Sequence, residues 1–290
     1  MHIQVQLEKY LSTSKENMSS YGIRHLYNAN YADMENGMNS GTFANLNLAK
    51  KIKFFFYNIL INIIFGIKIN NNYFYKKFKQ LCKKQNRLFD LNLIQCSIML
   101  EILNKYQLLN KKICVIGDGK ANFITGCLFL EKNTTLYTVN LPQALIQDYN
   151  IIKKFNLIDD KKIKVVNNEK DLDDNNIKLF LIPASNKEFL KNRNINLFTN
   201  SSSFQEMPPE ETTKYFEIIK TNKGSSLYCV NAEKKIMYDG IEINYKEFPF
   251  HLAKKIIFEK EATFTRKYYN LRPFFIHRLK NKCLQTLAQF

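Results

Sequence analysis

A change in the spacing of apolar residues near residue 110 limits most strongly what this chain can fold into. Before that point apolar residues recur every three or four positions, as on one face of a helix. The clearest series is Leu91, Ile94, Ile98, Ile102, Tyr106 and Leu109. After that point short apolar runs alternate with stretches of helical spacing, which predicts a mostly parallel sheet with helices on both faces. We therefore expect a helical N-terminal region at 1–110 and an α/β domain at 111–290.

The segments of the second region can be assigned one by one. Strands are expected at 113–116, 136–139, 163–166, 178–182, 195–199 and 226–230, and helices at 121–130, 141–155 and 208–221. Two of these helices carry Pro142 and Pro208 in the first turn, where a missing amide hydrogen costs nothing. Nearer the C-terminus Asp239-Gly240 separates Ile236-Met237-Tyr238 from Ile241-Glu242-Ile243, a pattern typical of a β-hairpin. This hairpin is expected to give the sheet an antiparallel edge.

The formal charge of +17, from 43 Lys and Arg against 26 Asp and Glu, is the usual sign of a polyanionic partner. However, six of these basic residues are arginine, the residue favoured for bidentate contacts with phosphates and bases, and the rest are lysine. The chain is also rich in Asn, Ile, Phe and Tyr and has no Trp, a skew typical of an AT-rich genome. We interpret the lysines as a dispersed solvated coat and expect no nucleic-acid partner, with a functional basic patch as the alternative.

Cysteine and histidine usage indicates neither disulfides nor a metal. None of the six cysteines lies in C-x-x-C spacing, and the four histidines are scattered along the chain. The N-terminus lacks the apolar run of a signal peptide. We expect buried, reduced thiols, no metal site and a cytoplasmic location.

The most hydrophobic stretch, 54–67, is too short for a spanning helix of about 20 residues and contains Asn58 and Asn62. It is expected to be a buried helix. The alternative is an interfacial helix, because lysines flank the stretch on both sides. Residues 50–79 would then make peripheral contact with the inner face of an anionic membrane.

The turn after the first expected strand has the sequence Gly117-Asp118-Gly119-Lys120-Ala121. In an open α/β sheet ligands bind at the carboxyl ends of the strands, where glycines allow a tight turn and close approach of the backbone. Ala121 is small enough for helix–strand packing and is tolerable if its φ is negative. The next strand ends at Asn140, about 20 residues on, where a residue that bonds a ribose hydroxyl is expected. The turn alone does not separate a cofactor site from a structural turn.

A polar run from Asn200 to Met207 follows the expected strand at 195–199 and precedes the Pro208 helix. Serine and asparagine cap helices well, so one interpretation is a capping loop. The run also lies at the carboxyl end of a strand, so the other interpretation is one side of a ligand site. Spacing alone leaves both open.

Three segments together resemble a family of sugar O-methyltransferases, S-adenosylmethionine-dependent enzymes associated with surface-glycan biosynthesis. The segments are 113–121, 138–142 and 200–207, the last of them followed by Tyr215-Phe216. The run from Ser203 to Met207 is the most specific of these elements. The resemblance covers residues 85 to 250, and the first 80 residues do not match.

The resemblance implies a Rossmann-like class I methyltransferase sheet, mostly parallel with an antiparallel edge hairpin, behind an N-terminal helical extension. It implies a cytoplasmic enzyme that transfers a methyl group from S-adenosylmethionine to a sugar or glycoconjugate. Cofactor contacts are expected at Gly117, Asp118, Gly119, Ala121, Asn140 and Leu141. Glu206 is expected as the general base, with His25, His251 and Asp239 as weaker candidates. Substrate contacts are expected at Asn200, Gln205 and Tyr215.

The chain departs from the family pattern at three positions. Val115 replaces an acid, Ala121 replaces the third glycine, and Asn140 replaces the carboxylate that bonds the ribose. Charge-assisted hydrogen bonds contribute about 1.5–3 kcal/mol against about 1 kcal/mol for neutral ones, so these changes would weaken cofactor binding. A degenerate, non-catalytic scaffold is therefore an alternative. A nucleic-acid methyltransferase and a nicotinamide-dependent oxidoreductase, which shares the glycine turn, are the other two.

Overall fold

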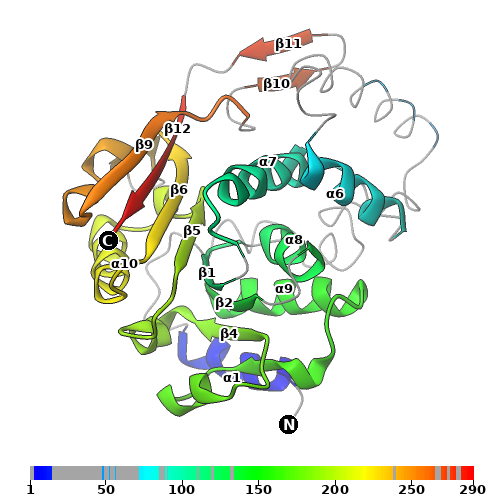
Figure 1. The fold of residues 1–290 in the computed structure, drawn as a ribbon, viewed down its shortest axis with the longest axis vertical. Helices are drawn as coiled ribbons and strands as arrows, with labels where there is room; N and C mark the ends of the chain where they lie inside the picture. The colour runs from blue at the N-terminus through cyan, green and yellow to red at the C-terminus, as the bar shows by residue number, and fades with distance from the viewer. Residues whose placement is uncertain are drawn as a thin grey trace.

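The structure, a computed structural model, describes residues 3–14, 48, 52, 56, 72–84, 89, 91–109, 111–118, 121–130, 134–237, 240–264, 269–272, 275–278 and 282–290. Its centre is an eight-stranded sheet with the order β3-β4-β2-β1-β5-β6-β12-β9 (Figure 1). The strands of this sheet are β1 (Lys112–Ile116), β2 (Thr135–Asn140), β3 (Ile163–Val165), β4 (Leu179–Pro183), β5 (Leu197–Ser201), β6 (Ser226–Ala232), β9 (Lys255–Glu261) and β12 (Cys283–Gln289). The six strands predicted between residues 113 and 230 all form, each within two residues of its expected ends.

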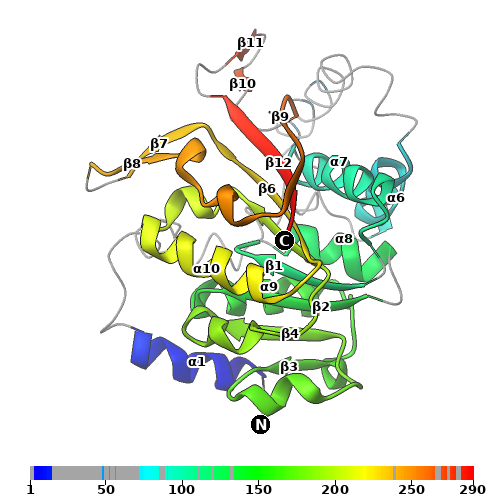
Figure 2. The same ribbon diagram turned by 60° about the vertical axis from the view of Figure 1, so that its left-hand side comes forward.

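The direction of the strands confirms a Rossmann-like sheet that is mostly parallel. The pairs among β1 to β6 are parallel, and β12 pairs antiparallel with both β6 and β9. The predicted hairpin forms as β7 (Lys234–Ile236) and β8 (Glu242–Asn244), but as a separate two-stranded sheet that extends from the body as an arm (Figure 2). The antiparallel edge is built instead from β9 and the C-terminal strand β12. A second small sheet pairs β10 (Tyr269–Arg272) with β11 (Phe275–Arg278).

Helices cover both faces of the sheet (Figures 1 and 2). The α-helices are α1 (Ile3–Ser14), α6 (Tyr73–Lys84), α7 (Leu91–Lys105), α8 (Asn122–Leu130), α9 (Pro142–Lys154) and α10 (Pro209–Thr221). Side chains of β1 alternate between the faces, as the pleat of a strand requires. Ile113 and Val115 join a buried cluster with α1 and α6 to α9, and Cys114 and Ile116 join a second cluster with α10. Short 3-10 helices lie at η2 (Asp160–Lys162), η3 (Glu169–Asp173), η4 (Ala184–Leu190), η5 (Phe204–Glu206), η6 (Tyr245–Glu247) and η7 (Phe250–Leu252).

The predicted apolar face of α7 is buried only in part. Ile94 and Leu109 of the predicted series are buried, Ile98 and Ile102 are half-buried, and Tyr106, beyond the end of the helix, is exposed. Leu93, Leu100 and Leu103, which lie outside that series, are also buried. Apolar residues lie on most sides of this helix, so their spacing did not single out the side that meets the core. Packing against neighbouring helices decides which side is buried.

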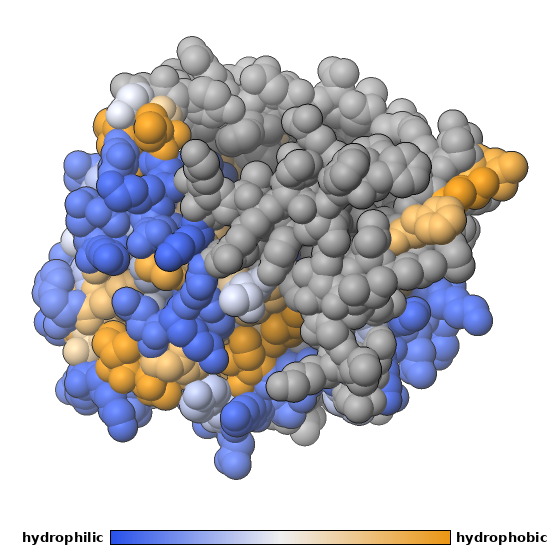
Figure 3. All heavy atoms as spheres, turned by 90° about the horizontal axis from the view of Figure 1, so that it is seen from above, coloured by the Kyte–Doolittle hydropathy of each residue, from blue (hydrophilic) through white to orange (hydrophobic). Residues whose placement is uncertain are grey.

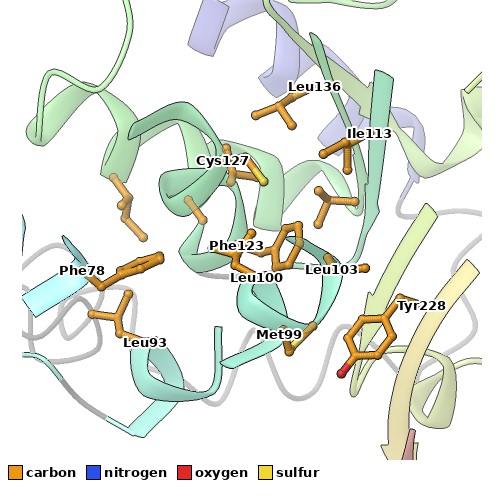
Figure 4. Packing of buried hydrophobic residues seen from close by; sticks show 14 of the residues in the cluster. Phe78, Leu93, Met99, Leu100, Leu103, Ile113, Phe123, Cys127, Leu136 and Tyr228 are labelled. Carbon is orange, nitrogen blue, oxygen red and sulfur yellow. The ribbon is translucent and has the colours of Figure 1, made fainter. Parts of the chain in front are cut away.

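The helices before residue 110 share one core with the sheet (Figure 4). Phe78 of α6 and Leu100 of α7 belong to the same buried cluster as Ile113 and Leu136 of the sheet. At Gly126 of α8 an added Cβ would lie 2.5 Å from both Phe78 and Leu100, so the missing side chain allows the close packing of these helices. The division of the chain into two domains at residue 110 remains a prediction, and the core is continuous across it.

The described residues of the predicted membrane-contact segment 50–79 are 52, 56 and 72–79, and Ile52 and Phe56 are exposed. Phe74, Tyr75 and Phe78 of α6 are buried, and Lys76 and Lys79 are exposed. The apolar face of α6 is thus committed to the core, and its outer face is basic. The stretch 54–67 lies outside the described residues apart from Phe56. In the ranges that the structure covers, no helix combines the length and apolarity needed to cross a bilayer.

The thiols are buried as the composition predicts, whereas the dispersed coat of lysines stays a prediction. On the face shown in Figure 3, hydrophilic residues interleave with smaller apolar patches over the described surface. All six cysteines are free, and five are buried, with Cys96 half-buried. Burial raises the pKa of Cys229 to about 12, which keeps this thiol protonated.

Candidate active site

The order of the strands places a switch point at the carboxyl end of β1. From β1 the chain adds β2, β3 and β4 on one side of the sheet and then returns to add β5 and β6 on the other. Open α/β sheets bind ligands at such a point, where the connections diverge. The predicted residues Gly117, Asn140 and Asn200 follow or end the three strands that meet there.

Gly117 and Ser203 join the turn after β1 to the run after β5. Gly117 has φ +74° and donates its amide hydrogen to Val139 O over 3.0 Å. A Cβ at this position would overlap the Oγ and Cβ of Ser203. Ser203 Oγ in turn donates to Ile116 O over 3.0 Å. Residue 117 therefore has to be glycine both for its backbone conformation and for its packing.

Two carboxyl groups bond the amides at the N-terminus of α8. Asp118 Oδ1 accepts from Phe123 N (3.2 Å) and its Oδ2 from Ile124 N (2.9 Å). Asp148 Oδ1 accepts from Ala121 N over 2.7 Å. The first amides of a helix lack partners within the helix, so these bonds cap α8. The carboxylate of Asp118, predicted to contact a cofactor, is therefore used within the protein.

Ala121 adopts a conformation that the sequence prediction did not allow for. Its φ is +47°, in the left-handed region, and its side chain is completely buried. The condition of a negative φ is thus not met. At the third glycine position of the family motif, Ala121 adopts a backbone conformation that glycine favours. For an alanine this conformation costs about 1–2 kcal/mol.

Asp148 is a site residue that the sequence did not reveal. It is fully buried on α9, and burial raises its pKa well above the usual range, with a further increase from the Asp118 carboxylate. The Ala121 amide and the Asn140 side chain oppose this shift. The signal available in the sequence was an acid in line with Leu145 and Ile152, which are buried on the same helix.

Asn140 and Leu141 lie at the end of β2, as predicted. Asn140 Oδ1 accepts from Leu141 N over 3.0 Å. Asn140 Nδ2 and Asp148 Oδ2 are both buried, and neither has a hydrogen-bond partner among the described residues. The Asn140 side chain is close enough to the Asp148 carboxyl to oppose the rise of its pKa, so this donor and this acceptor face each other at the end of β2. The remaining predicted cofactor residue, Gly119, lies outside the described residues.

Val115 lies between two threonines in the sheet. It is opposite Thr138 of β2 and Thr199 of β5. The hydroxyls of both threonines are buried and have no partner in the described chain. Two donors therefore flank the position where the family resemblance implies an acid, and valine cannot bond either of them.

The amide of Asn200 is committed to the loop that follows it. Its Nδ2 donates to Ile116 O over 3.1 Å and also to Ser203 Oγ. Its Oδ1 accepts from Phe204 N (3.2 Å) and from Asn231 Nδ2 (2.8 Å). The side chain is 1% exposed. This position is architectural, and the predicted substrate contact of Asn200 finds no support in it.

Gln205 and Tyr215 are also built into the core. Gln205 Oε1 accepts from Ala232 N over 2.7 Å, which ties η5 to the end of β6. Tyr215 is buried against Phe204, with Lys187 Nζ 5.8 Å from its ring centre. Burial raises the pKa of the Tyr215 hydroxyl. Both residues thus have supporting contacts within the protein, and their contact with substrate stays a prediction.

Glu206 differs from its neighbours because its side chain is 40% exposed. Its Oε1 lies 2.7 Å from Lys235 Nζ on β7, and this pair links the run after β5 to the hairpin arm. The carboxylate bonds this lysine, and the N-cap residue of α10 makes no side-chain capping hydrogen bond. Of the weaker candidates for the base, His251 is exposed on η7, and His25 and Asp239 lie outside the described residues.

The residues that sequence reasoning missed besides Asp148 are Asn231 and Lys235. They come together through pairing of β5 with β6 and through the hairpin, which no local pattern shows. Among the residues that the structure describes, no group of three or more His, Cys, Asp and Glu is arranged to hold a metal ion.

Comparison with known proteins gives fold-level likenesses without close relatives. No family model matches the chain, and no curated protein matches it. A SAM-dependent methyltransferase from Aquifex aeolicus is 12% identical, with a TM-score of 0.44 over 74% of this chain and 97% of that chain. An S-adenosylmethionine-dependent methyltransferase from Clostridium acetobutylicum is 13% identical, with a TM-score of 0.44 over 74% and 98%. Magnesium protoporphyrin IX methyltransferase from Synechocystis, with bound SAM, is 9% identical, with a TM-score of 0.41 over 74% and 84%. Likenesses this distant assign no ligand to the present chain.

Proposed function

We propose that the chain is an S-adenosylmethionine-dependent methyltransferase that acts on a hydroxyl group of a sugar or glycoconjugate. The observation that carries the cofactor class is the bonding of the α8 amides by Asp118 and Asp148. Dinucleotide cofactors place their pyrophosphate on free amides at this helix N-terminus. Here two amides of α8, Phe123 N and Ile124 N, and the Ala121 amide just before the helix are already bonded to carboxyl oxygens, and the Asp118 carboxylate would repel a phosphate. This disfavours a nicotinamide cofactor.

The same turn suits a ligand that carries positive charge and no phosphate. S-adenosylmethionine has a sulfonium and an ammonium group, both of which the Asp118 carboxylate attracts. At the end of β2 the buried Asn140 Nδ2 faces the Asp148 carboxyl without a hydrogen bond of normal geometry, and an acceptor on the ligand, such as a ribose oxygen, would complete its bonding. The charge and this donor together favour this cofactor.

Glu206 is the residue that we assign to the proton transfer. The bound cofactor would supply an already activated methyl group, so the protein has to align the acceptor hydroxyl and remove its proton. Within the run after β5, Phe204 and Gln205 are buried, whereas Glu206 is partly exposed. Lys235 holds the Glu206 carboxylate in place through the 2.7 Å contact. The sugar class rests on the resemblance of the run from Ser203 to Met207.

Methyl transfer from labelled S-adenosylmethionine to a panel of nucleotide-linked hexoses tests the function. Glu206→Gln is expected to lower turnover by about 100-fold or more, because it removes the base. Its affinity for S-adenosylhomocysteine should stay within about twofold of the wild type. Glu210→Gln changes an exposed acid in the first turn of α10 and is the matched control, with unchanged turnover.

Three outcomes would revise the proposal. Unchanged turnover in Glu206→Gln removes this residue from the base role. Transfer to RNA and not to any sugar replaces the substrate class. Binding of S-adenosylhomocysteine without transfer to any acceptor favours the non-catalytic scaffold.

A further inference from the structure

We propose that Asp148 is a positioning residue that holds the turn after β1 in its ligand-binding conformation through the amide of Ala121. The inference rests on the proposed function, because it concerns how the same site keeps its shape. Asp148 lies in the helix after β2, so it also joins the two strand ends that would contact the two halves of the cofactor.

The backbone at Ala121 needs support from outside the turn. Its φ of +47° is a conformation that alanine rarely adopts and that glycine adopts freely. The turn therefore tends to relax unless another group holds it. The hydrogen bond from Ala121 N to Asp148 Oδ1, 2.7 Å long and buried, supplies that hold.

Asp148 itself is fixed by the packing of α9. Leu145 and Ile152, on the same side of the helix, are completely buried. The helix begins at Pro142, directly after β2, so its position follows that of the sheet. A carboxyl group mounted on such a rigid element can impose a defined geometry on the turn.

Capping α8 does not by itself account for a buried acid at position 148. Asp118 already bonds two amides of α8 from within the turn. An apolar side chain would fill the site of Asp148 without the cost of burying a carboxyl group. In addition, the Asn140 side chain acts on the Asp148 carboxyl and opposes the rise of its pKa, so Asp148 faces the end of β2 as well as the turn. The acid is thus placed to couple these two segments.

The test combines a leucine variant, a conservative variant and a compensating change. Asp148→Leu is expected to weaken S-adenosylhomocysteine affinity by about tenfold or more, measured by calorimetry. Asp148→Asn keeps an oxygen for the Ala121 amide and should stay within about threefold of the wild type. Ala121→Gly removes the strain, so in the Asp148→Leu background it should recover about threefold or more of the lost affinity.

Amide hydrogen exchange at Ala121, measured by NMR without ligand, gives a second readout. Protection of this amide should be lost in Asp148→Leu and kept in Asp148→Asn. Thermal unfolding confirms that each variant is folded, and Asp148→Ala replaces the leucine variant if leucine prevents folding. A residue that only stabilises the fold would lower the unfolding temperature, but Ala121→Gly would then restore no affinity.

The outcomes separate this proposal from the proposed function. Wild-type affinity in Asp148→Leu, or an Ala121 amide that stays protected in it, overturns the positioning role. If the wild type does not bind S-adenosylhomocysteine, the proposed function fails. The exchange rate of the Ala121 amide then decides the role of Asp148 by itself.

Discussion

Ala121 N donates to Asp148 Oδ1 over 2.7 Å while Ala121 holds a φ of +47°. A carboxyl group on the helix after β2 therefore supports a backbone conformation that glycine would adopt without help. The relationship joins residues 27 positions apart and links the ends of β1 and β2. It also offers a physical reason why an alanine is tolerated in the turn.

Ala121→Gly should raise the free energy of unfolding by up to about 1 kcal/mol, because the relief of strain outweighs the loss of one buried methyl group. Ala144→Gly is the control, since Ala144 is also buried but lies inside α9. There glycine should lower the stability by about 1 kcal/mol. Urea unfolding of both variants checks this. Destabilisation of Ala121→Gly equal to that of Ala144→Gly would contradict the assigned strain.

Gly117→Ala should destabilise the protein by about 2–4 kcal/mol, because it adds both left-handed strain and overlap with Ser203. Gly224→Ala separates the two effects. Gly224 has φ +78°, but an added Cβ would meet nothing within 4 Å. Gly224→Ala should therefore lower the free energy of unfolding by about 1–2 kcal/mol, the cost of the strain alone. Equal losses in the two variants, measured by urea unfolding, would show that Ser203 does not press on the turn.

The raised pKa of Asp148 predicts a specific pH dependence of stability. Burial, followed by the Asp118 carboxylate, raises the pKa of Asp148 above its unfolded value of about 3.9. Between these two values the folded protein binds more protons than the unfolded chain, so its stability falls as the pH rises. The slope from this group reaches about 1.4 kcal/mol per pH unit.

Asp148→Asn removes this contribution, and apart from Asp118, which interacts with Asp148, it leaves the other carboxyl groups as they are. As the pH rises from 4 through the raised pKa of Asp148, the unfolding free energy of the wild type should therefore fall relative to that of the variant. Urea unfolding over a pH series measures it. Parallel stability curves for the two proteins would mean that the pKa of Asp148 does not change on folding.

Asn200→Ala should lower the stability by about 2–4 kcal/mol, because it leaves the Phe204 amide and Asn231 Nδ2 buried without their acceptor. Ser201→Ala, at an exposed position on the same strand, should change it by less than about 0.5 kcal/mol. Thermal unfolding compares them. A stable Asn200→Ala protein with a raised KM would restore Asn200 as a substrate contact.

The layout of the sheet could be predicted because local signals agree with the fold. Short apolar runs marked each parallel strand, and Pro142 marked the start of the helix after β2. The edge could not be predicted in this way. The C-terminal strand β12 inserts between β6 and β9, and pairing between Cys283 and Ala232 leaves no trace in local spacing.

The site was predicted in position but less well in detail. Gly117 and Asn140 do lie at the switch point, since the ends of parallel strands meet there. Three features of the site could not be predicted because they depend on the folded backbone. They are the positive φ of Ala121, the position of Asp148 on α9, and the burial of Asn200. Each follows from contacts between segments 27 or more residues apart, which residue type and spacing do not encode.

Calorimetric titration of the wild-type protein with S-adenosylmethionine, S-adenosylhomocysteine and NADH tests the central claim most directly. The bonded amides of α8 and the acidic turn predict binding of both S-adenosyl compounds and none of NADH. Binding of NADH alone would contradict the account. Absence of binding by either S-adenosyl compound at millimolar concentration would mean that this site does not hold the cofactor.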